Sequence, residues 1–251
     1  MAETFQTDAI VLRRNNLSEV DRFYVVYTAH LGKMSLMAKG IRKTKSKLAG
    51  HMEPGSLVRI MIARGRRSDK LAGAALSEHF SQLQSSFLGM TVLQTILEFA
   101  HLVTKEQYRD VALFHKFVDG LSFFDSWFGQ TLPTTEKTHL RLEVFFFHLL
   151  HHLGYRPELE SCVICRKDIL DNAIFDFERS GLAHAEHYPV KRAGDVLQTQ
   201  TVQALQSLSS HLVSEDFLPV STSNALVPIL QRFREHTTEA PLKSLVGLRN
   251  M

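Results

Sequence analysis

The hydrophobic pattern changes its period near Phe80, and this change restricts the chain to a fold that combines strands with helices. Before Phe80, short apolar and β-branched runs alternate with a period of two, which is typical of half-buried strands. In the third run, Met34, Leu36 and Ala38 fall on one face. The predicted strands are Thr7–Arg14, Arg22–Thr28, Lys33–Gly40, Leu57–Arg64 and Lys70–Glu78. Five short antiparallel strands fit a small closed barrel, for which the OB-fold is the leading candidate.

After Phe80 the apolar residues follow the spacing of helices. The first helical run has hardly a charge, so we expect it to be buried on more than one side. Gly154 is expected to end the third helix. The predicted helices are Leu83–Val103, Gln107–Phe124, Thr135–Leu153, Val196–Leu212 and Ser223–His236. The fold class is therefore α+β, with an OB-fold barrel in residues 1–80 and a mainly α-helical domain in residues 81–251 that contains a cysteine- and histidine-bearing segment, 155–195.

Charge is divided unequally between these two parts of the chain. Residues 1–80 hold 14 Lys and Arg against 7 Asp and Glu, a balance of +7, whereas the remainder holds 15 against 19, a balance of −4. A basic module joined to a mildly acidic one indicates a polyanion-binding face on the first part and a different role for the second.

Two loops of the predicted barrel concentrate this positive charge. One loop joins the third and fourth strands, and the other joins the fourth and fifth. Their cations are Lys39, Arg42, Lys43, Lys45 and Lys47 in the first loop and Arg64, Arg66 and Arg67 in the second. In OB-folds such loops flank the face that binds nucleic acid, so we predict that both follow a phosphate backbone by neutralising its charge. The alternative is that the loops only keep the protein soluble.

Aromatic residues give a weaker indication of base stacking. The aromatic residues before Phe80 are Phe5, Phe23, Tyr24 and Tyr27. Strand aromatics are more often core residues than stacking platforms. We therefore expect the barrel to grip the nucleic-acid backbone more than the bases.

Two pairs of metal-ligand residues lie in the segment between the third and fourth helices. Cys162-Val-Ile-Cys165 and His184-Ala-Glu-His187 are separated by 18 residues, which matches the spacing of a zinc ribbon. Turn signals at Asp171–Asn172 and Ser180–Gly181 would fold the intervening residues into a hairpin that brings the pairs together. Zinc at such a site would be structural, since four protein ligands leave no open position for water. The alternative is two buried thiols and two exposed imidazoles.

Signatures of common catalytic sites are absent from the sequence. It contains no phosphate-binding P-loop, no dinucleotide-binding glycine motif, no serine nucleophile elbow and no zinc-protease HExxH motif. Cys162 or Cys165 as a nucleophile would need a neighbouring base that the linear sequence does not place. His148, His151 and His152 cluster at helical spacing, which is typical of a polar helix face. We therefore expect a protein that is not an enzyme.

Three features favour a cytoplasmic location. No run of 18 or more residues is free of charged and polar groups, so no segment is expected to span a bilayer. The N-terminal residues lack the basic region and apolar core of a secretory signal. The 2 cysteines lie close together, which suits a metal knuckle or a redox pair better than an extracellular disulfide framework.

Motifs along nearly the whole chain resemble, in the same order, those of the RecO family of recombination mediators. In the barrel region the resembling motifs are Thr7–Arg14, Ser18–Arg22, Leu31–Ser35, Ala38–Arg42 and Lys45–Leu48. In the second half they are Phe145–Leu153, Leu153–Pro157, Cys162–Cys165 and Leu242–Val246. Each motif alone is short, but their order and spacing together make the resemblance specific.

The resemblance implies a non-catalytic mediator of DNA repair and homologous recombination in the RecF pathway. Such a protein would bind single- and double-stranded DNA, anneal complementary strands and help to load recombinase onto strands coated by single-strand binding protein (SSB). The implied partners are DNA, RecR and the acidic C-terminal tail of SSB, at the nucleoid of the bacterial cytoplasm. Some members of the family carry a four-cysteine zinc site whose second pair aligns with His184 and His187, and others lack the ligands.

Two other functions stay open on the sequence alone. The helical domain could dock protein partners while the basic barrel binds an acidic peptide tail, which would make the chain an interaction adaptor. A metal-dependent hydrolase built on Cys162, Cys165, His184 and His187 would need an open coordination position and a general base.

Overall fold

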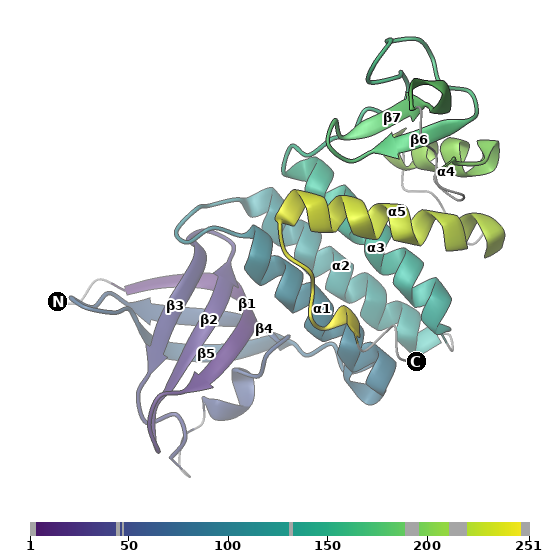
Figure 1. Cartoon of the computed structure of the whole chain (residues 1–251). Coiled ribbons are helices and arrows are strands. Elements are labelled where there is room, and N and C mark those ends of the chain that lie inside the picture. The colour runs from purple at the N-terminus through teal and green to yellow at the C-terminus, as the bar shows by residue number, and fades with distance from the viewer. Residues whose placement is uncertain are drawn as a thin grey trace. The chain divides into compact units, whose positions relative to one another are not determined.

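The computed structural model describes residues 4–43, 46, 48–130, 133–188, 196–210 and 220–246. Strand β1 (Thr4–Asn16) is shared by two strand pairs of a barrel. Its first half pairs antiparallel with β4 (Leu57–Ala63) and its second half with β2 (Arg22–Thr28). β2 pairs with β3 (Gly32–Ala38), and β4 pairs with β5 (Lys70–Glu78). A parallel contact between β3 and β5 closes the barrel in the order β1-β2-β3-β5-β4 (Figure 1). The predicted five-stranded OB-fold barrel is confirmed.

The barrel core follows the alternation read from the sequence. Met34, Leu36 and Ala38 of β3 are buried, as are Tyr24 and Val26 of β2. The residues between them along each strand point to the outer face, because successive side chains of a strand lie on opposite sides of the sheet. The connection between β3 and β4 contains a short 3-10 helix, Ala49–His51, and contributes two further core residues, Ile41 and Met52.

Two helices follow the barrel and cover part of its outer face. Helix α1 (Phe87–Val103) comes after a 3-10 turn, Leu83–Ser85, and helix α2 (Val111–Gln130) comes after a loop. Tyr27 of β2 anchors this contact, since its hydroxyl donates to the Asp110 carbonyl oxygen at 3.1 Å. The Tyr27 ring lies against two phenylalanines of α2, Phe114 and Phe117, at centroid distances of 5.9 and 6.0 Å.

Helix α2 starts and ends later than predicted. Its expected start at Gln107 is wrong because that residue has a left-handed φ of 55°, and its backbone N–H donates to the Lys33 carbonyl of β3 at 3.1 Å. Asp110 caps the helix instead, because its carboxylate accepts from Leu113 N at 2.8 Å. A tertiary contact with the barrel therefore sets the start of this helix, and the helix extends to Gln130.

Contacts divide the chain into two compact units, and the C-terminal segment belongs to the first. Unit 1 comprises the barrel, α1 and α2 up to Pro133, together with the segment from Leu242; unit 2 runs from Thr134 to Pro241. Glu98 of α1 holds the returning segment, since its carboxylate accepts from the backbone N–H groups of Lys243 and Ser244 at 3.0 and 2.9 Å. The domain boundary predicted at residue 80 stays a prediction.

The described residues of unit 2 form three α-helices and a small hairpin. The helices are α3 (Thr135–His152), α4 (Thr199–Ser210) and α5 (Val220–Thr238), and the hairpin strands are β6 (Ala173–Asp176) and β7 (Gly181–His184). Gly154 follows α3 with a φ of 96°, so it ends this helix as predicted. Among the described residues, no helix combines the length and the apolar character needed to cross a bilayer.

A buried ion pair links α3 to α5 inside unit 2. The Arg234 guanidinium donates through Nε and Nη2 to the two carboxylate oxygens of Glu143, both at 3.0 Å. The side chains are 1% and 0% exposed. Because both charges are out of water, removing Arg234 would take away the bidentate partner of Glu143, and the His139 imidazole, 3.6 Å from the carboxylate, would compensate its charge only when protonated.

Replacing Arg234 should therefore destabilise the protein strongly. We expect Arg234→Met to lower the free energy of unfolding by about 3 kcal/mol or more, because the Glu143 carboxylate would stay buried without its partner. Urea denaturation followed by circular dichroism measures this loss. The matched control is Arg232→Met, two positions away on α5, where the exposed guanidinium lies over the Phe177 ring and contributes at most about 1 kcal/mol. Equal losses in the two variants would contradict the assignment.

The three histidines of α3 are half-buried, so the expected polar helix face is wrong. The His151 ring lies 4.4 Å from the Phe147 ring. Burial, with smaller effects from His148 and Arg156, lowers the pKa of His151 from 6.5 to about 4. The apolar neighbours on α3 therefore keep this imidazole neutral in the folded protein.

The lowered pKa of His151 predicts a loss of stability in mild acid. The unfolded chain takes up this proton near pH 6.5 and the folded chain only near pH 4. The stabilising effect is thus complete above about pH 6.5 and is lost as the pH falls toward 4. We expect melting temperatures of His151→Gln to fall less between pH 7 and pH 5 than those of the unchanged protein. Parallel pH profiles for the two proteins would refute this role.

Candidate nucleic-acid interface and metal-ligand cluster

The contact that closes the barrel also connects the bases of the two basic loops. Met37 of β3 donates its backbone N–H to the carbonyl of Asp69 at 3.0 Å, and Met37 is the register partner of Lys70. The first basic loop begins at Lys39, two residues after Met37, and the second ends at Lys70. Lys39 and Asp69 therefore lie near this contact, and because β3 and β5 are parallel, the two loops extend from it in opposite directions along the strands.

The hairpin between β4 and β5 is held in a tight form by Gly65 and Asp69. A Cβ atom on Gly65 would lie 2.0 Å from the Ser68 carbonyl oxygen, so only glycine fits there. The Asp69 carboxylate accepts from the Gly65 backbone N–H at 3.3 Å and from Arg64 Nη1 at 2.9 Å. The Arg64 guanidinium also lies 5.2 Å from the centroid of the Phe5 ring. Arg64 is therefore engaged within the barrel.

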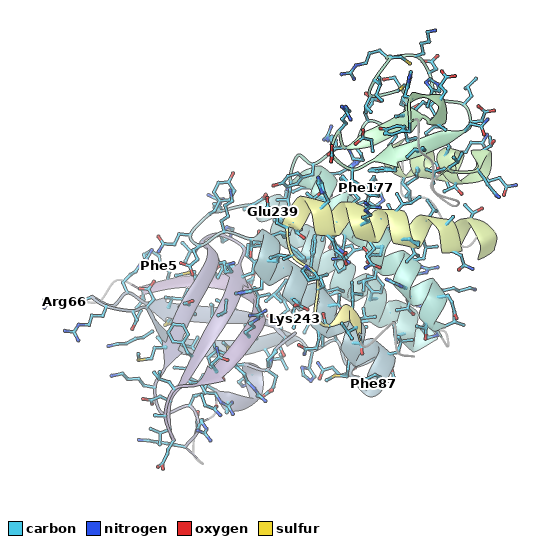
Figure 2. All side chains as sticks on the ribbon, viewed as in Figure 1. Phe5, Arg66, Phe87, Phe177, Glu239 and Lys243 are labelled. Carbon is cyan, nitrogen blue, oxygen red and sulfur yellow. The ribbon has the colours of Figure 1, made fainter. Side chains whose placement is uncertain are left out.

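Arg66 and Arg67, at the tip of the same hairpin, differ from Arg64. Both side chains are exposed, and neither has a hydrogen bond or ion pair to another residue in the described ranges. Figure 2 shows Arg66 extending away from the barrel, on the side that carries Phe5. Their charges are free to attract an external anion.

The first basic loop is fastened to the turn between β1 and β2. The Asp21 carboxylate accepts from the Gly40 backbone N–H at 2.7 Å. Arg42 donates from its backbone N–H to the Val20 carbonyl at 3.1 Å and from Nη1 to the Ser18 carbonyl at 2.7 Å. Lys39, Arg42 and Lys43 have exposed side chains. Lys45 and Lys47 lie outside the described residues.

The sequence alone did not distinguish the aromatic residues that face outward from the barrel from those that are buried in it. Tyr24 and Tyr27 are 0% and 1% exposed, which confirms them as core residues. Phe5 and Phe23 are half-buried. The alternation in β2 was the available signal, since a buried Tyr24 requires Phe23 to face outward.

The two predicted metal-ligand pairs meet in unit 2. Strands β6 and β7 pair in register from Ala173 opposite His184, as the turn signals predicted. One ligand atom from each of Cys162, Cys165, His184 and His187 lies within 4.8 Å of every other, and the Cys165 Sγ to His184 Nδ1 distance is 3.4 Å. These two thiols and two imidazoles could hold a metal ion.

The electrostatics of this cluster fit a metal with thiolate ligands. Burial opposes ionisation of the Cys162 thiol, but hydrogen bonds with the backbone of Cys165, His184 and Ile164 outweigh it and lower the pKa of Cys162 to about 6. The His187 Nε2 atom is buried without a hydrogen-bond partner among the described residues. His184 Nε2 lies 3.1 Å from the carbonyl oxygen of Asp168, which leaves Nδ1 for a metal. The donor set is that of a tetrahedral zinc site.

Family models and curated relatives match almost the whole chain. Residues 1–80 match the model described as Recombination protein O N terminal, and residues 84–245 match Recombination protein O C terminal. The chain is 30% identical over 177 residues to the DNA repair protein RecO of Dehalococcoides mccartyi, which covers 70% of this chain and 67% of the relative. It is 27% identical over 249 residues to the DNA repair protein RecO of Bifidobacterium adolescentis, with coverages of 96% and 97%. It is 26% identical over 254 residues to the DNA repair protein RecO of a Synechococcus species, with coverages of 96% and 87%.

Proposed function

Because the chain belongs to the RecO family, we propose that it is a mediator of DNA repair and homologous recombination whose barrel binds single- and double-stranded DNA. The observation that carries this proposal is the position of the contact between Met37 and Asp69, which is flanked on both sides by the exposed cations of the two basic loops. Exposed cations on both sides of this contact can neutralise phosphates of a strand that crosses it and release their counterions. Binding of this kind depends on salt and tolerates any base sequence.

The basic loops do not contribute equally to the proposed interface. Lys39, Arg42, Lys43, Arg66 and Arg67 have exposed side chains and are the main candidates for phosphate contacts. Arg64 contributes less directly, because its guanidinium is paired with Asp69. Lys45 and Lys47 are assigned to the interface on sequence alone.

The steps beyond DNA binding follow from family membership. The chain is proposed to anneal complementary strands and to help load recombinase onto SSB-coated strands, as part of the RecF pathway. Its proposed partners are RecR and the acidic C-terminal tail of SSB, and its proposed location is the bacterial cytoplasm at the nucleoid. It is proposed to act without catalysing a covalent step. Annealing of complementary oligonucleotides, bare and coated with SSB, tests this role, and failure on coated strands would remove the mediator assignment.

Zinc is proposed as the metal of the cluster in unit 2. Cys162, Cys165, His184 and His187 would hold it, and the four protein ligands would leave no position for substrate or water. When bound, the metal would cross-link the turn at Cys162–Cys165 to the hairpin of β6 and β7, and its role would be structural. The backbone donors around Cys162 favour the thiolate that such a site needs.

Charge reversal in the first basic loop should abolish DNA binding. We expect the triple variant Arg42→Glu, Lys43→Glu and Lys45→Glu to fold normally but to lose affinity for a labelled oligothymidylate, because each change replaces an attraction to phosphate with repulsion. Fluorescence anisotropy at low salt measures the affinity. Unchanged affinity in dilute buffer would reject the assignment.

A second triple variant controls for net charge. Lys105, Arg109 and Lys116 are exposed on the loop and helix that follow α1, outside the two basic loops. Reversing these three residues to Glu changes the net charge of the protein by the same amount. We expect this control to bind nearly as tightly as the unchanged protein, and an equal loss in both triples would point to overall charge in place of a defined interface.

Metal binding should be stoichiometric and should need both ligand pairs. We expect metal analysis after dialysis against zinc to find one zinc per chain, and the metal to raise the melting temperature because it binds only the folded hairpin. Cys165→Ser and His187→Asn should each lose the metal and this stabilisation. His236→Asn, an exposed histidine of α5, is the control and should keep both. Absence of zinc in the unchanged protein would overturn the assignment.

A further inference from the structure

The outer face of the barrel carries an apolar pair that the charge-based interface does not use. The strand register places four residues in one row: Asn15 of β1 opposite Phe23 of β2, Phe23 opposite Met37 of β3, and Met37 opposite Lys70 of β5. Phe23 and Met37 are half-buried, and Asn15 and Lys70 are exposed. The row therefore has an apolar centre on two neighbouring strands and polar side chains at both ends.

The neighbouring side chains confirm that this row faces outward. Tyr24 and Leu36, adjacent to Phe23 and Met37 along their strands, are each 0% exposed and belong to the barrel core. The outer face of β2 continues from Phe23 through half-buried Val25 to Tyr27, and the α2 residues Phe114 and Phe117 pack their rings against Tyr27. Helix packing thus explains the burial of Tyr27 and leaves Phe23 and Met37 on the accessible part of the face.

Cations surround this apolar pair. Arg13 of β1 lies opposite Val25, in the row next to Phe23, and is exposed. Lys70 adjoins Met37 on the other side, and Lys39 follows Met37 by two residues. An apolar platform with positive charge on both flanks matches a strand whose phosphates are charged and whose bases offer flat apolar faces. An apolar surface of a protein partner would match Phe23 and Met37 but would leave the flanking cations without a binding partner.

We propose that Phe23 and Met37 form a stacking platform for unpaired bases of the DNA strand that the basic loops hold. This inference rests on the proposed DNA binding and deepens it, because it names the part of the strand that this face recognises. Stacking on an aromatic ring tolerates any base but requires that the base is unpaired. The platform therefore gives the barrel a preference for single strands over duplexes, which the phosphate contacts alone would not.

The test compares three probes that separate base contacts from phosphate contacts. They are an oligothymidylate, a duplex of the same length, and an abasic deoxyribose-phosphate chain of the same length, each measured by fluorescence anisotropy at one salt concentration. We expect the full-length protein to bind the oligothymidylate more tightly than the abasic chain. Equal affinity for these two would overturn the platform while leaving DNA binding intact. No binding to any of the three would instead overturn the proposed function.

Variants of Phe23 assign the difference to this residue. We expect Phe23→Leu, which keeps the apolar contact but removes the ring, to weaken oligothymidylate binding about tenfold and to leave the affinity for the duplex and the abasic chain unchanged. Phe23→Tyr keeps the ring and should bind as the unchanged protein does. Unaltered oligothymidylate binding by Phe23→Leu would refute the inference.

Phe5 provides the matched control for these variants. It is the other half-buried phenylalanine of the barrel, and its ring is covered by the Arg64 guanidinium instead of standing in the row. Phe5→Leu should therefore leave the ratio of oligothymidylate to abasic-chain affinity unchanged. If Phe5→Leu lowers this ratio as much as Phe23→Leu does, the preference does not belong to the row of Phe23 and Met37.

Discussion

The contact between β3 and β5 is the constraint on which the candidate interface depends. The other strand pairs of the barrel are antiparallel, whereas this pair is parallel and is formed at a single position, where Met37 meets Lys70. The hydrogen bond from Met37 to Asp69 fixes the hairpin between β4 and β5 against the strand that leads into the first basic loop. Closure also removes the exposed strand edges that an open sheet would present.

Closure acts together with local anchors that differ between the two loops. In the hairpin, Gly65 allows the close approach to Ser68 and Asp69 neutralises Arg64, so the tip arginines carry the free charge. In the first loop, Asp21 holds the backbone of Gly40. Acidic side chains thus shape both basic loops, which explains why charge counts alone overestimate the number of available cations.

Features with a local cause could be predicted from the sequence. The strands were found because core residues such as Met34 and Leu36 alternate with outward residues, and the hairpin between β6 and β7 was found because its turn residues mark both ends. Asn172 and Ser180 adopt left-handed φ values of 45° and 51° at these turns. The cysteine pair and the histidine pair come close together because of that hairpin and because of local hydrogen bonds around Cys162–Cys165. One of these bonds runs from Arg166 N to the Cys162 carbonyl at 2.9 Å.

Features with a distant cause could not be predicted. The start of α2 depends on a bond between Gln107 and β3, which no window of sequence around the helix contains. The pairing of Glu143 with Arg234 joins residues 91 positions apart. The outward row of Phe23 and Met37 needs the strand register as well as the alternation, because only the register places Lys70 beside it.

The claim that charge on the barrel binds the DNA backbone is tested most directly by the salt dependence of affinity for an oligothymidylate. If the basic loops neutralise phosphates, the logarithm of the association constant falls linearly with the logarithm of salt concentration, with a slope of about −0.7 for each phosphate contacted. Because the two basic loops offer several cations, we expect several phosphate contacts and therefore a steep fall of affinity with salt concentration. A slope near zero, or no binding in dilute buffer, would contradict the claim.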